Sequence, residues 1–222
     1  MQADTSGHDD APGEPPCALA GLDASARGYA DAETARDVAR WRVAERARLL
    51  AVRLALNVAA RQSADARLAA ALDERLGSLA GLTVATYWPF RGEPDLRPWA
   101  AGRRAGGVSI CLPVVVEKAR PLVFRQWSPD VPLVRGVWNI PIPPEEAPAL
   151  VPDLVIAPVV GADAGNFRLG YGGGYYDRTL AAMSRLGHRP RVIGVGYDLQ
   201  RIATIFPQPH DVPMTEMLLV ET

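Results

Sequence analysis

Short, largely apolar runs that alternate with helical patterns constrain the fold of this sequence more than any other feature. The runs that indicate strands are residues 82–88, 107–113, 121–127, 153–160 and 191–197. Several are unbroken apolar stretches, which is typical of strands covered on both faces. Residues 95–105 and 175–187 have helical patterns, whereas the proline-rich residues 127–152 should be irregular. The sequence therefore predicts one three-layer α/β domain with a mostly parallel sheet flanked by helices.

The chain before residue 80 has a different character. Residues 1–35 are rich in Gly, Pro, Ala and Asp. They offer little apolar surface to offset ordering entropy, which predicts a disordered tail. A helix is expected over residues 33–56, and a second one from an N-cap at Ser63 to Gly77. The folded domain should therefore span residues 36–222 and begin with two helices.

Charge and composition exclude several classes of function. The net charge is −1 at pH 7, so nothing favours nucleic acid as a partner. No stretch approaches the roughly 18 apolar residues of a membrane span, and the acidic start does not resemble a signal peptide. Cys17 and Cys111 cannot build a disulfide framework, and Cys111 lies in an apolar run typical of a core strand. We therefore expect a cytoplasmic monomer without nucleic-acid or membrane partners.

The segment "NFRLGYGGGYYDRTL", residues 166–180, is the strongest candidate for a binding site. It places four glycines within residues 170–174, after one predicted strand and before a predicted helix. In an open α/β sheet ligands bind at this place, and backbone N–H groups with a helix N-terminus favour phosphate. Arg168 and Arg178 add positive charge. Asp177 is explained if Mg²⁺ lies between its carboxylate and the phosphate.

The glycine segment also has a simpler explanation. Glycine-rich turns are often only tight turns, and the spacing here matches neither the dinucleotide-binding fingerprint nor a P-loop. These residues alone favour phosphate binding but do not identify the substrate. On the first predicted helix, Arg42, Arg46, Arg53 and Leu49 fall within about 60° of one another at 100° per residue. They could contact the same ligand, although a solvated arginine face is the alternative.

Four segments taken together resemble the 5-formyltetrahydrofolate cyclo-ligase family, also called 5,10-methenyltetrahydrofolate synthetase. They are "YWPFRGEPDLRP" (87–98), "GVWNIPIP" (136–143), "RLGYGGGYYDRTL" (168–180) and "PHDVPM" (209–214). The similarity covers roughly residues 38 to 221. It implies an α/β fold of the type shared with sugar-phosphate isomerases and CoA-transferases. It also implies an enzyme that uses ATP and Mg²⁺ to convert 5-formyltetrahydrofolate into 5,10-methenyltetrahydrofolate, ADP and phosphate through a phosphorylated formyl group.

The resemblance also implies a role for individual residues. Catalytic roles are implied for Arg168, Tyr175 and Asp177. The residues implied to bind ATP are Arg42, Arg46, Arg168, Leu169, Gly170, Tyr171, Gly172, Gly173, Gly174, Tyr175 and Tyr176. The residues implied to bind the reduced folate are Trp88, Glu93, Trp138, Tyr171, Gly172, Gly173, Gly174 and Tyr175. Asp177 and Asp211 are the implied ligands of Mg²⁺.

This chain departs from the family pattern at a few positions near the phosphates. Arg42 stands where the family usually has lysine, and a planar guanidinium is not a point charge. Tyr171 and Gly173 stand where some members carry Arg and Lys. A non-catalytic relative that only binds folate or nucleotide is therefore the first alternative. An isomerase or CoA-transferase-like enzyme is a second alternative, which rests on fold analogy alone.

Overall fold

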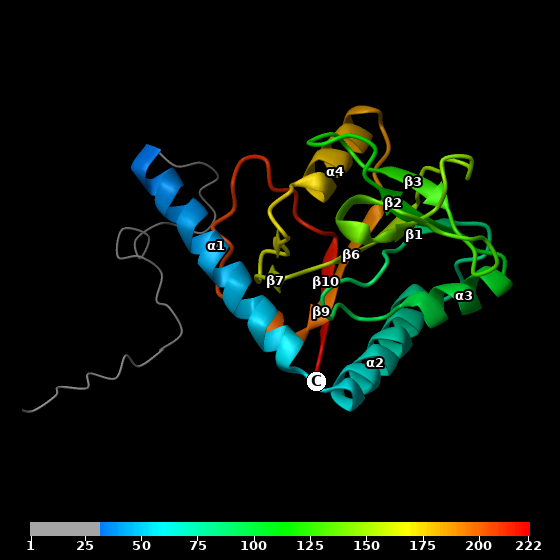
Figure 1. Cartoon of the computed structure of the whole chain (residues 1–222), viewed down its shortest axis with the longest axis horizontal. Coiled ribbons are helices and arrows are strands. Elements are labelled where there is room, and N and C mark those ends of the chain that lie inside the picture. Colours follow the sequence, from blue (N-terminus) through cyan, green and yellow to red (C-terminus); the bar gives the residue numbers. More distant parts are fainter. Residues whose placement is uncertain (1–31) are drawn as a thin grey trace, which may run out of the picture.

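A six-stranded sheet in the order β10–β9–β6–β1–β2–β3 forms the centre of the domain (Figure 1). Its strands are β1 (Thr83–Ala85), β2 (Ser109–Val114), β3 (Val123–Gln126), β6 (Leu154–Pro158), β9 (Arg191–Tyr197) and β10 (Glu216–Val220). Neighbouring strands run parallel except for β2 and β3. The structure, a computed structural model, describes residues 32–222. It confirms the prediction of a mostly parallel sheet.

The strands differ from the predicted runs in three respects. β1 is only three residues long, because the chain leaves the sheet after Ala85. One further hydrogen bond joins it to β2, from Thr86 N to Cys111 O at 3.0 Å. β3 pairs antiparallel with β2, since the eight residues 115–122 that connect them are too few for a parallel crossover. β10 was not predicted, and it extends the sheet by pairing in parallel with β9.

Four helices surround this sheet. They are α1 (Ala32–Ala55), α2 (Val58–Leu76), α3 (Arg97–Ala105) and α4 (Tyr175–Arg185). In Figure 1, α1 and α2 diverge like the two arms of a V, with the C-terminus near its apex. Within residues 32–222, no helix combines the length and apolar character that crossing a bilayer requires. Of the predicted tail (residues 1–35), residues 32–35 belong to α1 and the rest lies outside the described residues.

The predicted start of the second helix was wrong. Asn57, not Ser63, is the N-cap, and its side-chain oxygen accepts a hydrogen bond from Ala60 N at 2.9 Å. Ser63 lies inside α2, where its hydroxyl accepts from Arg67 Nη1 at 3.0 Å. The helix ends before Gly77 as predicted, with a φ of 57° that glycine adopts without strain.

Alternate residues of the central strands face two separate apolar layers. Ile156 of β6 packs with Leu68 and Leu72 of α2 and with residues of α3 on one face of the sheet. Val155 and Ala157 face the opposite layer, which includes residues of α4. This arrangement confirms the three-layer prediction. Such strands read as continuous apolar runs because both of their faces are buried.

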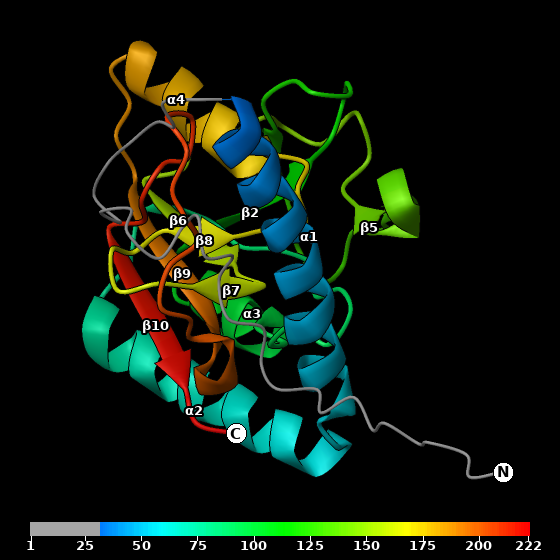
Figure 2. The same ribbon diagram turned by 90° about the vertical axis from the view of Figure 1, so that its left-hand side faces the viewer.

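Small hairpins complete the fold. β4 (Val134–Arg135) pairs with β5 (Pro141–Ile142) around the 3₁₀ turn η2 (Val137–Asn139), inside the segment predicted to be irregular. This β4–β5 hairpin stands away from the sheet (Figure 2). β7 (Gly161–Ala162) pairs with β8 (Arg168–Leu169) between β6 and α4, and the 3₁₀ turn η3 (Asp198–Gln200) follows β9.

Candidate active site

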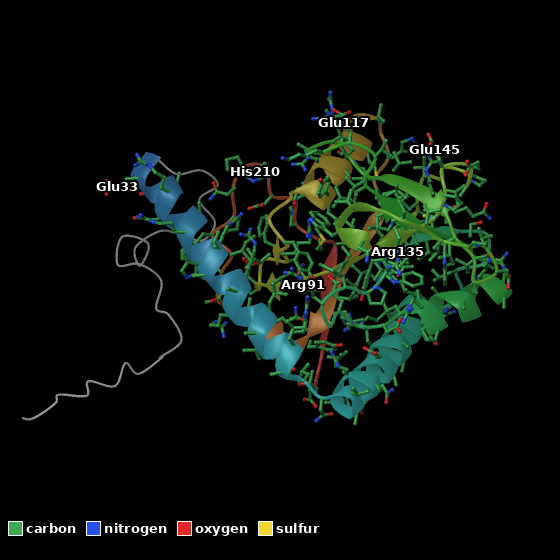
Figure 3. All side chains as sticks on the ribbon, viewed as in Figure 1. Glu33, Arg91, Glu117, Arg135, Glu145 and His210 are labelled. Carbon is green, nitrogen blue, oxygen red and sulfur yellow. The ribbon has the colours of Figure 1, made fainter. Side chains whose placement is uncertain are left out.

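A cavity of about 370 Å³ lies at the carboxyl ends of β1, β2 and β6. Its walls come from α1, the segment after β1, the β4–β5 hairpin, the loop between β8 and α4, and the segment around Asp211. Arg91 and His210, two further lining residues, lie on the side of the domain that α1 covers (Figure 3). Every residue for which the resemblance implied binding of ATP, folate or metal lines this one cavity, whereas Leu49, Arg53 and Arg178, which the sequence also proposed near the ligand, are not among its lining residues.

The glycine loop, residues 170–174, joins β8 directly to α4. Gly172 and Gly174 have φ angles of 93° and 61°, which other residues rarely adopt. Gly174 is the N-cap of α4 and makes no side-chain capping bond, so the first N–H groups of the helix remain for a ligand. Together with the macrodipole of α4, these N–H groups make the glycine loop suitable for binding an anion.

Two arginines of α1 reach the cavity in different ways. Arg42 is buried and donates to the carbonyls of Ile205 at 2.9 Å and Phe206 at 2.7 Å, and it forms an ion pair with Asp211. Arg46 donates only Nε, to Gly170 O at 2.6 Å. Within residues 32–222 its two Nη atoms have no hydrogen-bond partner. Burial, assisted by the charge of Arg42, lowers the pKa of the Arg46 guanidinium. Arg46 therefore presents free donors beside the glycine loop.

The two aspartates lie close to each other across the cavity wall. Asp177 accepts from Arg168 Nη2 at 3.1 Å and from the backbone N of Val212 at 3.2 Å. Asp211, the residue before Val212, accepts from Gln208 N at 2.6 Å and pairs with Arg42. In the described part of the chain, no group of three or more acidic, His or Cys side chains could hold a metal. A cation held by these two carboxylates would complete its shell with oxygens of water or of a substrate.

A buried carboxyl group lies at another part of the wall. Glu93 is 6% exposed, accepts from Phe90 N at 2.9 Å and from the hydroxyl of Tyr171 at 3.0 Å. Burial raises the pKa of Glu93 to about 7, although the charge of Arg53 and both hydrogen bonds act in the opposite direction. The charge of this buried carboxyl group can therefore change near neutral pH.

Aromatic side chains form the flat walls. Trp138, at the tip of the β4–β5 hairpin, is 58% exposed and has a φ of 56°. Its ring meets Tyr175 edge-on, with centroids 6.1 Å apart. Trp88 is half-buried, and the guanidinium of Arg97 lies 4.7 Å from its ring centroid. These rings give the cavity an aromatic lining, which suits a planar heterocycle.

Sequence reasoning missed several residues of the site. Arg53 was placed on the correct face of the helix, but its complete burial and its contact with Tyr171 were not foreseen. The unforeseen lining residues include Tyr87, Phe90, Arg91, Leu112, Val115, Leu122, Ile140 and His210. Phe90, Arg91 and His210 belong to segments singled out for other residues. The apolar residues gave no signal, since a cavity wall and a core have the same composition.

Comparisons with known proteins agree on one family. The model of the 5-formyltetrahydrofolate cyclo-ligase family matches residues 38–220. The 5-formyltetrahydrofolate cyclo-ligase of Escherichia coli (strain K12) is 32% identical over 142 residues, which cover 60% of this chain and 74% of that protein. The protein of the same name from Haemophilus influenzae is 28% identical, and the match covers 61% and 74% of the two chains.

Solved structures show the same architecture. The 5,10-methenyltetrahydrofolate synthetase of Aquifex aeolicus superimposes with a TM-score of 0.66 at 26% identity, covering 78% of this chain and 86% of that one. The synthetase of Mycoplasma pneumoniae gives a TM-score of 0.63 at 23% identity, with 79% and 96% covered. The family match spans the whole described domain apart from its ends, and it includes all the segments that line the cavity. This chain belongs to the 5-formyltetrahydrofolate cyclo-ligase family.

Proposed function

We propose that this protein converts 5-formyltetrahydrofolate into 5,10-methenyltetrahydrofolate with ATP and Mg²⁺, releasing ADP and phosphate. The observation that carries the proposal is the cavity itself. It brings an anion-binding glycine loop and a buried carboxylate, Glu93, into one space walled by aromatic rings. A nucleotide phosphate and a pterin can therefore meet there. We also expect a cytoplasmic monomer that acts on these small molecules without nucleic-acid or membrane partners.

The chemistry consists of two displacements. The formyl oxygen attacks the γ-phosphorus of ATP, the bond from this phosphorus to the β–γ bridging oxygen breaks, and ADP leaves. N10 of the folate then bonds to the formyl carbon and loses its proton. Cleavage of the carbon–oxygen bond releases phosphate and leaves the methenyl bridge. Phosphorylation is needed because an amide oxygen is a poor leaving group, so the protein's task is positioning and charge stabilisation.

The chain's own groups fit the phosphoryl step. The two unpaired Nη atoms of Arg46 and the N–H groups at the start of α4 can hold phosphate oxygens. Arg168 lies behind them with its guanidinium carbon 4.8 Å from the Tyr176 ring centroid and its Nη2 on Asp177. Arg42, whose donors are engaged by protein groups, supports this wall by holding Asp211.

The carboxylates of Asp177 and Asp211 fit Mg²⁺. This ion commonly takes one or two carboxylates and completes its shell with water and phosphate oxygens, so a two-carboxylate wall suffices. The hydrogen bond from Val212 N to Asp177 keeps the two acidic segments together. When bound, Mg²⁺ would offset the negative charge of the transferring phosphoryl group. The arginine partners of both aspartates hold these carboxylates in a fixed orientation.

Glu93 fits the folate. A pterin presents neighbouring N–H donors on one ring edge, and a carboxylate accepts such a pair in a bidentate manner. The faces of Trp88 and Trp138 would cover the ring planes. Orientation by Glu93 would turn the formyl group toward the glycine loop, where the phosphates lie.

The test is the ATP-dependent appearance of methenyl-folate absorbance when the purified full chain is mixed with 5-formyltetrahydrofolate, ATP and Mg²⁺. Reactions without ATP and without Mg²⁺ are the controls. The variant Asp130→Asn, an exposed aspartate that does not line the cavity, should react like the wild type. Tight binding of both ligands without any absorbance change would refute catalysis and support a protein that only binds them.

A further inference from the structure

Tyr171 of the glycine loop connects two buried ionisable groups. Its hydroxyl oxygen lies 2.6 Å from Arg53 Nη2 and 3.0 Å from Glu93 Oε1. A third neighbour, Phe90 O, lies at 3.3 Å. Arg53 belongs to α1, Glu93 to the segment after β1, and Tyr171 to the loop that begins the nucleotide end of the cavity. One hydroxyl group thus joins three parts of the chain.

Arg53 is an immobile anchor for this contact. It is 0% exposed, and it donates Nε to Arg91 O and Nη1 to Val159 O, both at 3.0 Å. These two bonds fix the plane of the guanidinium, which leaves Nη2 aimed at Tyr171. Because three of its donors are already bonded, Arg53 loses no further conformational entropy when a ligand binds.

The hydrogen-bond inventory decides the direction of the contact. Arg53 can only donate, so the Tyr171 oxygen accepts from it and has its single proton left for another acceptor. Glu93 Oε1 is nearer to the hydroxyl than Phe90 O is. Glu93 Oε2 accepts from Phe90 N at 2.9 Å. Each carboxylate oxygen is therefore held by one donor, which favours the ionised form and fixes the orientation of the group.

We propose that Tyr171, held by Arg53, is a positioning residue that orients the Glu93 carboxylate for the folate and ties the glycine loop to the folate end of the cavity. The proposal rests on the function proposed above. It explains what a tyrosine does at a loop position where the resemblance implies a cation in some family members. The hydroxyl serves the other substrate, and Arg46 supplies charge at the phosphates instead.

The charged and titratable neighbours of Glu93 agree with this role. Arg53 of α1 is the only cation among the described groups that affect it, and it lowers the pKa of Glu93. Tyr171 lowers this pKa by hydrogen bonding. Tyr87, in the same segment as Glu93, and Tyr176 of α4 also interact with it; burial raises the pKa of both phenols, and the Glu93 charge raises it further. Both phenols are therefore neutral near pH 7, so Arg53 and Tyr171 are the side chains that stabilise the charge of Glu93.

The test compares Tyr171→Phe with the wild type in the full chain. Tyr197→Phe is the matched control, since it removes a buried hydroxyl that bonds Asp65 at 3.3 Å and does not line the cavity. The first readout is the titration of the Glu93 side-chain carboxyl carbon by ¹³C NMR without ligands, with Glu93→Gln used to assign the signal. Loss of one hydrogen bond to the carboxylate should raise the midpoint by about one pH unit in Tyr171→Phe and leave Tyr197→Phe unchanged.

The second readout is steady-state kinetics across pH. In Tyr171→Phe the KM for 5-formyltetrahydrofolate should rise about tenfold at neutral pH, and the acid limb of kcat/KM should move upward with the NMR midpoint. In a Glu93→Gln background the same substitution should add little. An unchanged midpoint, or a moved midpoint with an unchanged folate KM, would overturn the proposal. If the wild type lacks turnover, the proposed function fails, and the NMR midpoint alone then decides the link between Tyr171 and Glu93.

Discussion

Arg42 and Arg46 lie one helical turn apart, yet their replacement by alanine should have opposite consequences. Arg42 is tied to Asp211 and to two carbonyls of the 205–206 segment, so it should contribute to stability. Arg46 makes one bond, to Gly170 O, and has free donors at the glycine loop, so it should contribute to ATP binding. Sequence alone treated them as equivalent, because both lie on the same helix face.

The magnitudes follow from the contacts. Arg42→Ala leaves the Asp211 side chain, which is 10% exposed, without its ion-pair partner, and breaking such a pair costs about 3–5 kcal/mol. For a domain of this size, that corresponds to a Tm lower by roughly 6–20 °C. Arg46→Ala loses one hydrogen bond, worth about 1 kcal/mol or a few degrees. Its KM for ATP should rise about ten- to hundredfold, since charge-assisted contacts to phosphate are lost.

Thermal unfolding and ATP-dependent kinetics, measured on both variants, separate the two roles. Arg40→Ala is the control for a shortened side chain on the same helix, because Arg40 is exposed and, among residues 32–222, its ion-pair partner is Asp37. The KM for 5-formyltetrahydrofolate should stay near the wild-type value in Arg46→Ala. Equal losses of Tm in the two variants, or a stable Arg42→Ala protein with the larger ATP defect, would refute the reasoning.

Three further predictions concern single side chains. Asp177→Asn should keep the bond from Val212 N but lose turnover by orders of magnitude, partly restored by added Mg²⁺; near-normal activity would exclude the metal role. Cys111 should resist alkylation at pH 8 in the native protein and react after unfolding, because burial raises the pKa of its thiol to about 12; rapid native labelling, followed by mass spectrometry, would contradict this. Glu93→Gln should raise Tm at pH 8 and leave it unchanged at pH 4. Folding raises the pKa of Glu93 to about 7. The wild type therefore loses stability as the pH rises through that value, and this loss is on the order of 3 kcal/mol. Equal Tm values for the variant and the wild type at pH 8 would count against a costly buried charge.

Local sequence patterns predicted most of the helices and strands. The strands buried on both faces, the helix that ends at Gly77 and the helix after the glycine loop all have signals within their own residues. The start of α2 was misplaced because Asn57 and Ser63 are both good N-caps, and only the path of the chain after α1 decides between them. β10 was missed because its apolar run, residues 217–220, has only four residues and no predicted helix beside it marks it as part of the sheet.

The sequence predicted many of the residues that line the cavity, but it did not predict their contacts. The resemblance placed its residues in four segments and on one helix, and the fold brings all of them to one cavity. The sequence could not predict the partner of each charged side chain, because Arg42 contacts Asp211 and Arg53 contacts Tyr171 only in the folded chain. The burial of a side chain likewise depends on the folded chain and not on its neighbours in the sequence. Nothing near Glu93 in the sequence indicates that it is 6% exposed.

The wide separation of these partners also governs when the protein becomes competent during its synthesis. The contacts from Arg53 to Tyr171, Arg46 to Gly170 and Arg42 to Asp211 close over 118, 124 and 169 residues. The helix that carries the arginines is therefore translated well before the residues that they contact. Contacts of such high sequence separation form slowly and expose the unfinished chain to misfolding. A nascent chain that stops before Asp211 already contains the partners of Arg46 and Arg53, but it lacks the carboxylate that pairs with Arg42.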